Sequence, residues 1–185
     1  MVFRGFFCIF APAMNRLRYF FVRLSRLRHS RGFGIQSPTD FRFVRDVICE
    51  SWPYHSYSSI GLDDDWLRRK LGQLYFRLVN NRQPMVVVDW LNMGDYLQAG
   101  CRKAKLVKSA DKVEMAFLPL QIDYQGLFDM CDENSVVVFQ DIWRNMPLWH
   151  CIEYDTRVSV TFDLYFCGIV LFDKKRARQN YKVNF

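Results

Sequence analysis

The 185-residue sequence lacks the spacings that mark metal centres and redox-active dithiols. Its six cysteines include no CxxC pair, and its three histidines do not stand at metal-ligand spacing. A zinc site or a redox dithiol requires such spacing, so the sequence indicates neither. Cys131, Cys151 and Cys167 lie in or beside apolar segments, where a free thiol packs well. We therefore expect reduced core thiols and a cytoplasmic protein.

Long apolar runs are absent as well. No stretch approaches the ~18 apolar residues that a membrane-spanning helix needs. Residues 1–13 carry a short apolar run after Arg4 and then Ala11-Pro12-Ala13, which is similar to a small-residue cleavage site. This pattern resembles a signal peptide only weakly. An arginine-rich segment follows in place of a secreted domain, and Met14 offers an alternative start. We interpret residues 1–13 as a dispensable extension.

Acidic residues are missing from the first part of the chain. The net charge is +7, yet the middle of the sequence is close to balanced, so the excess belongs to the two ends. Such a charge permits acidic partners, and its placement matters more than its sum. A second basic cluster lies near the C-terminus, between Lys174 and Lys182. The arginines that precede the first acid, Asp40, are Arg4, Arg16, Arg18, Arg23, Arg26, Arg28 and Arg31.

A basic amphipathic helix is predicted from Met14 to about Ser30. Three roles fit such a helix. Its apolar side can pack on its own domain with the arginines in solvent, it can lie on an anionic membrane, or it can contact nucleic acid. We favour the first, and a nucleic-acid partner is not expected because base-reading residues and a known motif are missing. The apolar positions at helical spacing are Leu17, Phe20, Phe21, Leu24 and Leu27.

Two further helices complete an N-terminal helical region over residues 14–80. The turn Gly34-Ile35-Gln36-Ser37-Pro38 supplies an N-cap serine and a first-turn proline for one of them. Asp63-Asp64-Asp65 begins the other. Three consecutive side chains do not converge on one ion, so we expect helix capping rather than cation binding. A chain of this length suits a single domain.

The segment Met85–Gly94 organises the second part, residues 81–185. Its run Val86-Val87-Val88-Asp89 is typical of a parallel strand buried on both faces. Ser135–Phe139 has the same character, and we expect the two strands to be adjacent or nearly so in the sheet centre. In nucleotide-type α/β folds the ligand lies beyond such a strand, against an acid and a glycine-rich turn. Asp89 takes the acid position, and the turn keeps one glycine, Gly94.

The remaining pattern predicts an α/β fold, with a mostly parallel sheet and an antiparallel C-terminal edge. The first two C-terminal strands read as an antiparallel hairpin-like pair. Helices are expected over Tyr96–Arg102, Ile122–Met130 and Met146–Glu153. Further strands are expected at Lys105–Lys108 on an edge, and at Lys112–Leu118, Arg157–Leu164, Gly168–Phe172 and Tyr181–Phe185.

Several of these segments together resemble a group of Bacteroidetes proteins among the class I S-adenosylmethionine-dependent methyltransferases, similar to small-molecule O-methyltransferases. The resemblance covers roughly Met14 to Phe185. It implies a Rossmann-like methyltransferase sheet, here shortened and incomplete. The segments that carry it are Gly34–Pro38, Leu74–Asn80, Ser135–Trp143, Val160–Phe172 and Asn180–Phe185.

The resemblance also implies site residues. Asp89 and Gly94 would hold S-adenosylmethionine, and Asp141 would orient a small-molecule acceptor or act as its base. His150 is a conceivable base, although a lone histidine on a tryptophan-rich helix is more often packed. Metal-dependent relatives place an acid after the fourth strand and an acidic pair after the fifth. This chain has Leu118-Pro119-Leu120 at the first place and one acid at the second, so no metal is expected.

The chain departs from the family pattern at the cofactor turn. Trp90, Leu91 and Met93 put large side chains where backbone should approach the ligand, and we expect them to fill that pocket. The chain between Gly94 and Lys112 is too short for two strand–helix units, and no acid is available for the ribose. We favour a degenerate descendant that has lost cofactor binding and serves in interaction or structure. An active S-adenosylmethionine-dependent O-methyltransferase and a basic membrane-surface module remain as alternatives.

Overall fold

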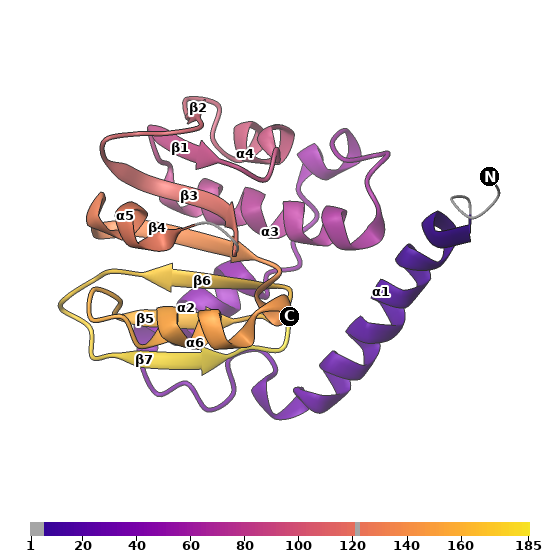
Figure 1. The fold of residues 1–185 in the computed structure, drawn as a ribbon. Coiled ribbons are helices and arrows are strands. Elements are labelled where there is room, and N and C mark those ends of the chain that lie inside the picture. Colours follow the sequence, from indigo (N-terminus) through magenta and orange to yellow (C-terminus); the bar gives the residue numbers. More distant parts are fainter. Residues whose placement is uncertain (1–5, 121–122) are drawn as a thin grey trace.

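A seven-stranded sheet forms the centre of the protein (Figure 1). The computed structural model describes residues 6–120 and 123–185, with side chains from Arg16 onward. The strand order is β2-β1-β3-β4-β6-β5-β7. The strands are β1 (Val86–Asp89), β2 (Lys105–Val107), β3 (Val113–Pro119), β4 (Cys131–Gln140), β5 (Val160–Asp163), β6 (Cys167–Leu171) and β7 (Gln179–Lys182).

The sheet is mostly parallel, and its C-terminal part contains the antiparallel pairings, as predicted. All neighbouring strands pair in parallel except β6, which is antiparallel to both β4 and β5. β5 and β6 form the expected antiparallel pair. The antiparallel strand lies inside the sheet, because β7 adds outside β5 and runs parallel to it.

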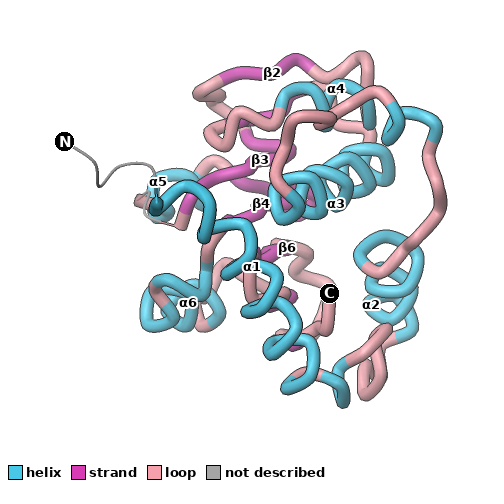
Figure 2. Tube along the Cα trace, turned by 90° about the vertical axis from the view of Figure 1, so that its right-hand side faces the viewer, coloured by secondary structure: helices cyan, strands magenta, loops and turns pink. Residues whose placement is uncertain are grey.

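Helices cover both faces of this sheet (Figures 1 and 2). Because successive side chains of a strand point to opposite faces, Val87 and Val138 contribute to one apolar cluster, and Val88 and Val137 contribute to the other. Burial on both faces explains the uniformly apolar strands. The first cluster includes residues of α3 (Trp66–Arg82), of α4 (Gly94–Gly100) and of the π-helix Val44–Ile48 that follows α2 (Pro38–Phe43). The second includes α5 (Tyr124–Asp129) and α6 (Met146–Glu153).

β1 and β4 are near neighbours, as predicted, with only β3 between them. The chain between β1 and β3 is also short, as predicted. β2 and β3 lie on either side of β1, yet residues 108–112 connect them without a helix. α4 is therefore the one helix between β1 and β3 in this described stretch, and β2 is an edge strand as expected.

The helix caps that the sequence predicts are present in the structure. Asp65 is the N-cap of α3, and its carboxylate accepts hydrogen bonds from Leu67 N and Arg68 N at 2.8 and 2.9 Å. Ser37 caps α2, with Pro38 in the first turn. The predictions for α5 and α6 hold, although Ile122, the first residue of the former prediction, lies outside the described residues.

The N-terminal helix is longer than predicted. α1 spans Phe6–Ser25, so it begins eight residues before Met14 and includes part of the interpreted extension. Residues 1–5 lie outside the described part of the chain. The helical backbone therefore runs continuously across the expected boundary at Met14.

The cysteines whose side chains are described, Cys49, Cys101, Cys131, Cys151 and Cys167, are all free. Burial raises the pKa of the Cys131 thiol to about 12 and also raises that of Cys167, which keeps both protonated and unreactive near neutral pH. The expectation that Cys151 is a core thiol is wrong, because this residue is exposed on α6.

Two segments that carry the resemblance, the Gly34–Pro38 turn with the helix it opens and the C-terminal end of the chain, meet in space although some 140 residues separate them. Asp40, in the helix that the Gly34–Pro38 turn opens, is 2% exposed. Its carboxylate accepts from Arg176 Nη1 at 2.7 Å and from the Tyr181 hydroxyl at 3.2 Å. Asn184 also donates to Ser30 Oγ at 3.0 Å. The turn and the C-terminal segment thus close the β7 edge of the sheet together.

Candidate functional site

The carboxyl end of β1 is the place to seek a ligand site. The chain leaves β1 toward β2 on one side and then crosses to β3 on the other side, so the strand order reverses here. Open α/β sheets bind ligands outside the strand ends at such a point. Asp89 is the last residue of β1, and Gly94 begins α4 directly beyond it.

The Asp89 carboxylate is committed to its own turn. Its Oδ1 accepts from Leu91 N at 3.0 Å, and its Oδ2 accepts from Met93 N at 2.9 Å. The residue is 6% exposed. Trp90 N donates to Phe117 O at 2.9 Å, which ties the start of this turn to β3. Both carboxylate oxygens therefore stabilise the backbone turn.

The residue that follows the second strand, β2, is a lysine and not an acid. Lys108 directly follows β2, and its Nζ donates to Asp89 O at 2.5 Å and to Asn92 Oδ1 at 2.8 Å. Trp90 Nε1 in turn donates to Lys108 O at 2.7 Å. The end of β2 is therefore fastened to the turn after β1 by a cation.

Gly94 serves packing between α4 and β2. A Cβ added at Gly94 would lie 3.2 Å from Leu106 Cδ1 on β2, so the side of this residue without a side chain faces a neighbouring strand. Gly94 therefore lets the backbone of α4 approach the side chain of Leu106. The glycine is thus explained without a bound ligand.

The large residues of the turn behave differently from one another. Met93 is 1% exposed and belongs to the core beneath the turn. Leu91 is partly buried against the same core. Trp90 is 49% exposed, because its indole lies outward over the chain that leaves β2. Met93 thus occupies the interior position, and Trp90 does not.

A cleft of about 610 Å³ lies beside the turn, between α4 and the loop before α3. Its walls include Gly94 but neither Asp89 nor Asp141. The buried hydroxyl of Tyr96 donates to Asp64 Oδ2 at 2.9 Å, and the pKa of Tyr96 is raised by burial and by this carboxylate. Sequence reasoning assigned the Asp63–Asp65 run to helix capping alone and did not predict that this loop forms a wall. The cleft is lined by Ser59, Ile60, Gly61, Leu62, Asp63, Asp64, Arg68, Asn92, Met93, Gly94, Asp95, Tyr96 and Gln98.

Asp141 lies apart from the other two predicted site residues. It follows β4, which β3 separates from β1, so the two strand ends are roughly 10 Å apart. Its φ is 62°, and its N donates to Phe166 O at 2.7 Å. The Asp141 carboxylate lies 3.4 Å from Arg144 Nε. The structure does not bring Asp89, Gly94 and Asp141 together around one cavity.

His150 and metal ligation add nothing to this site. His150 Nδ1 lies 2.6 Å from Glu153 Oε2 within α6, and its side chain is 51% exposed. The expectation that His150 is packed is therefore wrong. In the described part of the chain no three His, Cys, Asp or Glu side chains form a group that could hold a metal ion.

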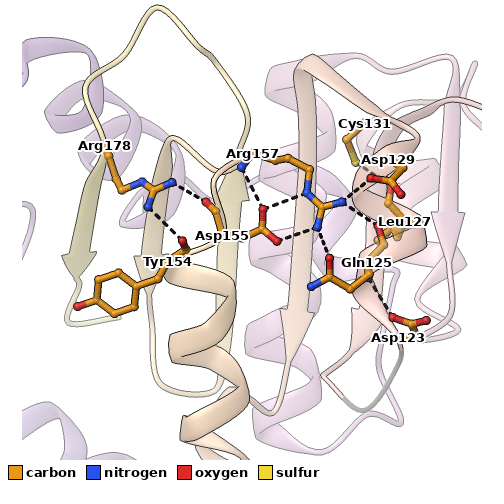
Figure 3. A network of polar contacts seen from close by, with 9 residues as sticks. All are labelled: Asp123, Gln125, Leu127, Asp129, Cys131, Tyr154, Asp155, Arg157 and Arg178. Atoms are coloured by element: carbon orange, nitrogen blue, oxygen red, sulfur yellow. Dashed lines mark hydrogen bonds and ion pairs between the residues drawn. The ribbon is translucent and has the colours of Figure 1, made fainter.

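A second polar cluster joins α5 to the segment before β5 (Figure 3). Arg157 donates from Nε and Nη2 to Asp155, and from Nη1 to Asp129 and to Gln125 O. Its Nη2 also donates to Gln125 Oε1. All five guanidinium donors are thus used within the chain, and hydrogen bonding to Arg157 lowers the pKa of Asp155. This network holds secondary structure together and leaves no donor for a ligand.

No protein-family model, curated protein or solved structure matches this chain. Across the described residues no helix is long and apolar enough to cross a membrane.

Proposed function

We propose that this chain is a degenerate, methyltransferase-like Rossmann scaffold that does not bind S-adenosylmethionine and serves in interaction. One observation carries the proposal, namely that both oxygens of the Asp89 carboxylate accept hydrogen bonds from the turn that follows it. Each carboxylate oxygen can accept a second hydrogen bond, but Asp89 is 6% exposed and does not line the cleft, so an oxygen would have to turn away from its amide to reach a cofactor hydroxyl. This rotation would leave a buried amide unpaired, at a cost of about 1–3 kcal/mol.

The surrounding residues do not fit the cofactor either. Lys108 offers donors where the ribose hydroxyls need an acceptor, and its Nζ is already bonded to Asp89 O and Asn92 Oδ1. Gly94 faces Leu106, so its small size serves the fold. The free cysteines of the described chain support a reducing compartment, and the proposal places the protein in the cytoplasm.

Calorimetric titration with S-adenosylmethionine and with S-adenosylhomocysteine tests this proposal. We expect no saturable heat at millimolar ligand, a binding free energy weaker than about −4 kcal/mol. Micromolar binding would overturn the proposal. If Asp89→Asn then weakened that binding tenfold or more while Asp111→Asn, at an exposed position outside the cleft, did not, Asp89 would be a working cofactor residue.

The stability of the same two variants tests the structural role of Asp89 directly. Asparagine has one acceptor oxygen where aspartate has two, so Asp89→Asn should lower the free energy of unfolding by about 1–3 kcal/mol. Asp111 is exposed in the link between β2 and β3, and Asp111→Asn should change stability by less than about 0.5 kcal/mol. Equal stability of the two variants would contradict the role given to Asp89.

The second candidate function is an active S-adenosylmethionine-dependent O-methyltransferase acting on a small molecule. The cleft of about 610 Å³ beside Gly94 favours it, because its volume suits a small-molecule ligand. Asp141 would then have to act on an acceptor from outside the walls of this cleft. The titration separates the two candidates, since only the enzyme binds the cofactor.

A further inference from the structure

From Arg16 onward, where its side chains are described, α1 contacts the rest of the protein through one face. The Tyr19 ring packs 4.7 Å from the ring of Trp66, and Arg18 lies 4.0 Å over the ring of Trp143. Asn184 Nδ2 donates to Arg23 O at 3.0 Å, which ties the helix to the C-terminal segment. The helix therefore runs along the edge at which the parallel strands end (Figure 1).

The opposite face of α1 and of the turn after it is apolar and points to solvent. At about 100° per residue, the centre of this stripe lies roughly 180° around the helix from Tyr19 and Val22. The expectation that the apolar side packs on its own domain is wrong, because Tyr19 packs on the core and Val22 is half-buried, whereas the stripe is exposed. We call the five residues the apolar stripe, and their exposed fractions are Leu17 58%, Phe20 60%, Phe21 58%, Leu24 54% and Leu27 58%.

Cations border the apolar stripe. Arg16, Arg23 and Arg28 are exposed, and no acid precedes Asp40 in the sequence. Arg16 and Arg28 form no salt bridge or hydrogen bond with any residue that the structure describes.

We propose that the apolar stripe of α1 docks the protein on the surface of an anionic lipid bilayer. A helix of 20 residues, about 30 Å long, would lie in the plane of the interface. Its stripe would enter the boundary between headgroups and acyl chains, and the bordering arginines would meet lipid phosphates. Charge decides against a second copy of the chain, because that copy would bring the same arginines against these.

Docking is independent of the cofactor proposal, since the apolar stripe and the end of β1 share no residue. Co-sedimentation of the full chain with phosphatidylcholine vesicles, with and without phosphatidylglycerol, tests it. We expect strong binding to the anionic vesicles, weak binding to phosphatidylcholine alone, and a loss of binding as salt is raised. Equal binding to the two vesicle types, or none to either, would overturn the proposal.

Variants separate the contributions of the apolar stripe and of its arginines. Phe20→Ser with Leu24→Ser should weaken partitioning roughly tenfold or more, because two exposed apolar side chains no longer enter the bilayer. Arg16→Gln with Arg28→Gln should weaken binding to anionic vesicles and leave the weak binding to phosphatidylcholine unchanged. Both pairs of positions are exposed, so the fold should persist, which circular dichroism checks.

A matched control lies at the opposite edge of the sheet. Met85 precedes β1 and is 57% exposed, so Met85→Ser removes an equally exposed apolar side chain away from α1. It should bind vesicles as the wild type does, and an equal loss in Met85→Ser would overturn the proposal. A dimer in solution that Phe20→Ser with Leu24→Ser dissociates, together with absent vesicle binding, would overturn it in favour of a second copy as the occupant.

Discussion

Arg26 and Asp163 form a bidentate ion pair that fastens the end of α1 to the end of β5. Arg26 Nη1 donates to Asp163 Oδ1 and Nη2 donates to Oδ2, each at 2.9 Å, and Nη1 also donates to Asp163 O at 2.9 Å. The side chains are 14% and 2% exposed, so the pair is largely withdrawn from solvent. This pair helps to set which face of α1 turns outward.

Arg26→Met should destabilise the protein strongly. It leaves the Asp163 carboxylate buried without its cation, which costs about 3 kcal/mol in the free energy of unfolding. Chemical denaturation measures this loss. Arg16→Met, on the exposed side of the same helix, is the control and should stay within about 0.5 kcal/mol of the wild type. Similar values for the two variants would show that the ion pair does not anchor α1.

Gly168→Ala should disturb the packing of α6 on β6. A Cβ at Gly168 would lie 2.2 Å from Cη2 of Trp149, a ring that is fully buried. We expect a loss of about 2 kcal/mol, typical of overpacking. Gly126→Ala in α5 is the matched control, because nothing lies within 4 Å of its added Cβ. That substitution should stabilise the protein by about 0.5–1 kcal/mol through helix propensity, and a loss there would contradict the packing argument.

The pH dependence of stability should carry a contribution from Lys70. Its Nζ lies 4.2 Å over the ring of Phe185 and 5.2 Å over that of Tyr19. Burial, and then the charges of Arg77 and Arg23, lower the pKa of Lys70 from 10.5 to about 8. Between these values the unfolded chain binds more protons than the folded protein. The free energy of unfolding therefore gains a contribution as the pH rises from about 8 to 10.5.

Urea denaturation of the wild type and of Lys70→Met across this pH range measures that contribution. Titration of tyrosines and cysteines affects both proteins, so it cancels in their difference. The free energy of unfolding of the wild type should rise relative to that of Lys70→Met as the pH increases, by at most about 1.4 kcal/mol per pH unit. Lys105→Met, which replaces an exposed lysine on β2, should follow the wild type. Parallel curves for the wild type and Lys70→Met would refute the burial of this charge.

Removal of residues 1–13 should leave the melting temperature nearly unchanged. Among the residues whose side chains the structure describes, Arg18, Tyr19, Arg23 and Arg26 hold α1 to the body, and the deletion keeps all four. Differential scanning calorimetry of the two forms measures the change. A loss of several degrees would show that the deleted residues belong to the fold.

The sequence by itself determined those features that depend on near neighbours in the chain. The apolar runs of β1 and β4 predicted buried central strands because burial on both faces demands them. The caps at Ser37 and Asp65 act over two or three residues and were readable for that reason. The short chain between Gly94 and Lys112 predicted a missing helix, since a crossover helix needs a minimum length.

Tertiary structure decided the features that depend on residues far apart in the chain. Periodicity showed that the N-terminal helix has an apolar side. Contacts at Tyr19 and an ion pair at Asp163 decided that this side faces solvent. Nothing near Asp40 in the chain indicated the partners of its carboxylate, and only the fold brings Arg176 and the Tyr181 hydroxyl to it. The hydrophobic pattern of a sequence indicates which residues favour burial. The hydrogen-bond partners of a carboxylate depend on which donors the folded chain brings near it.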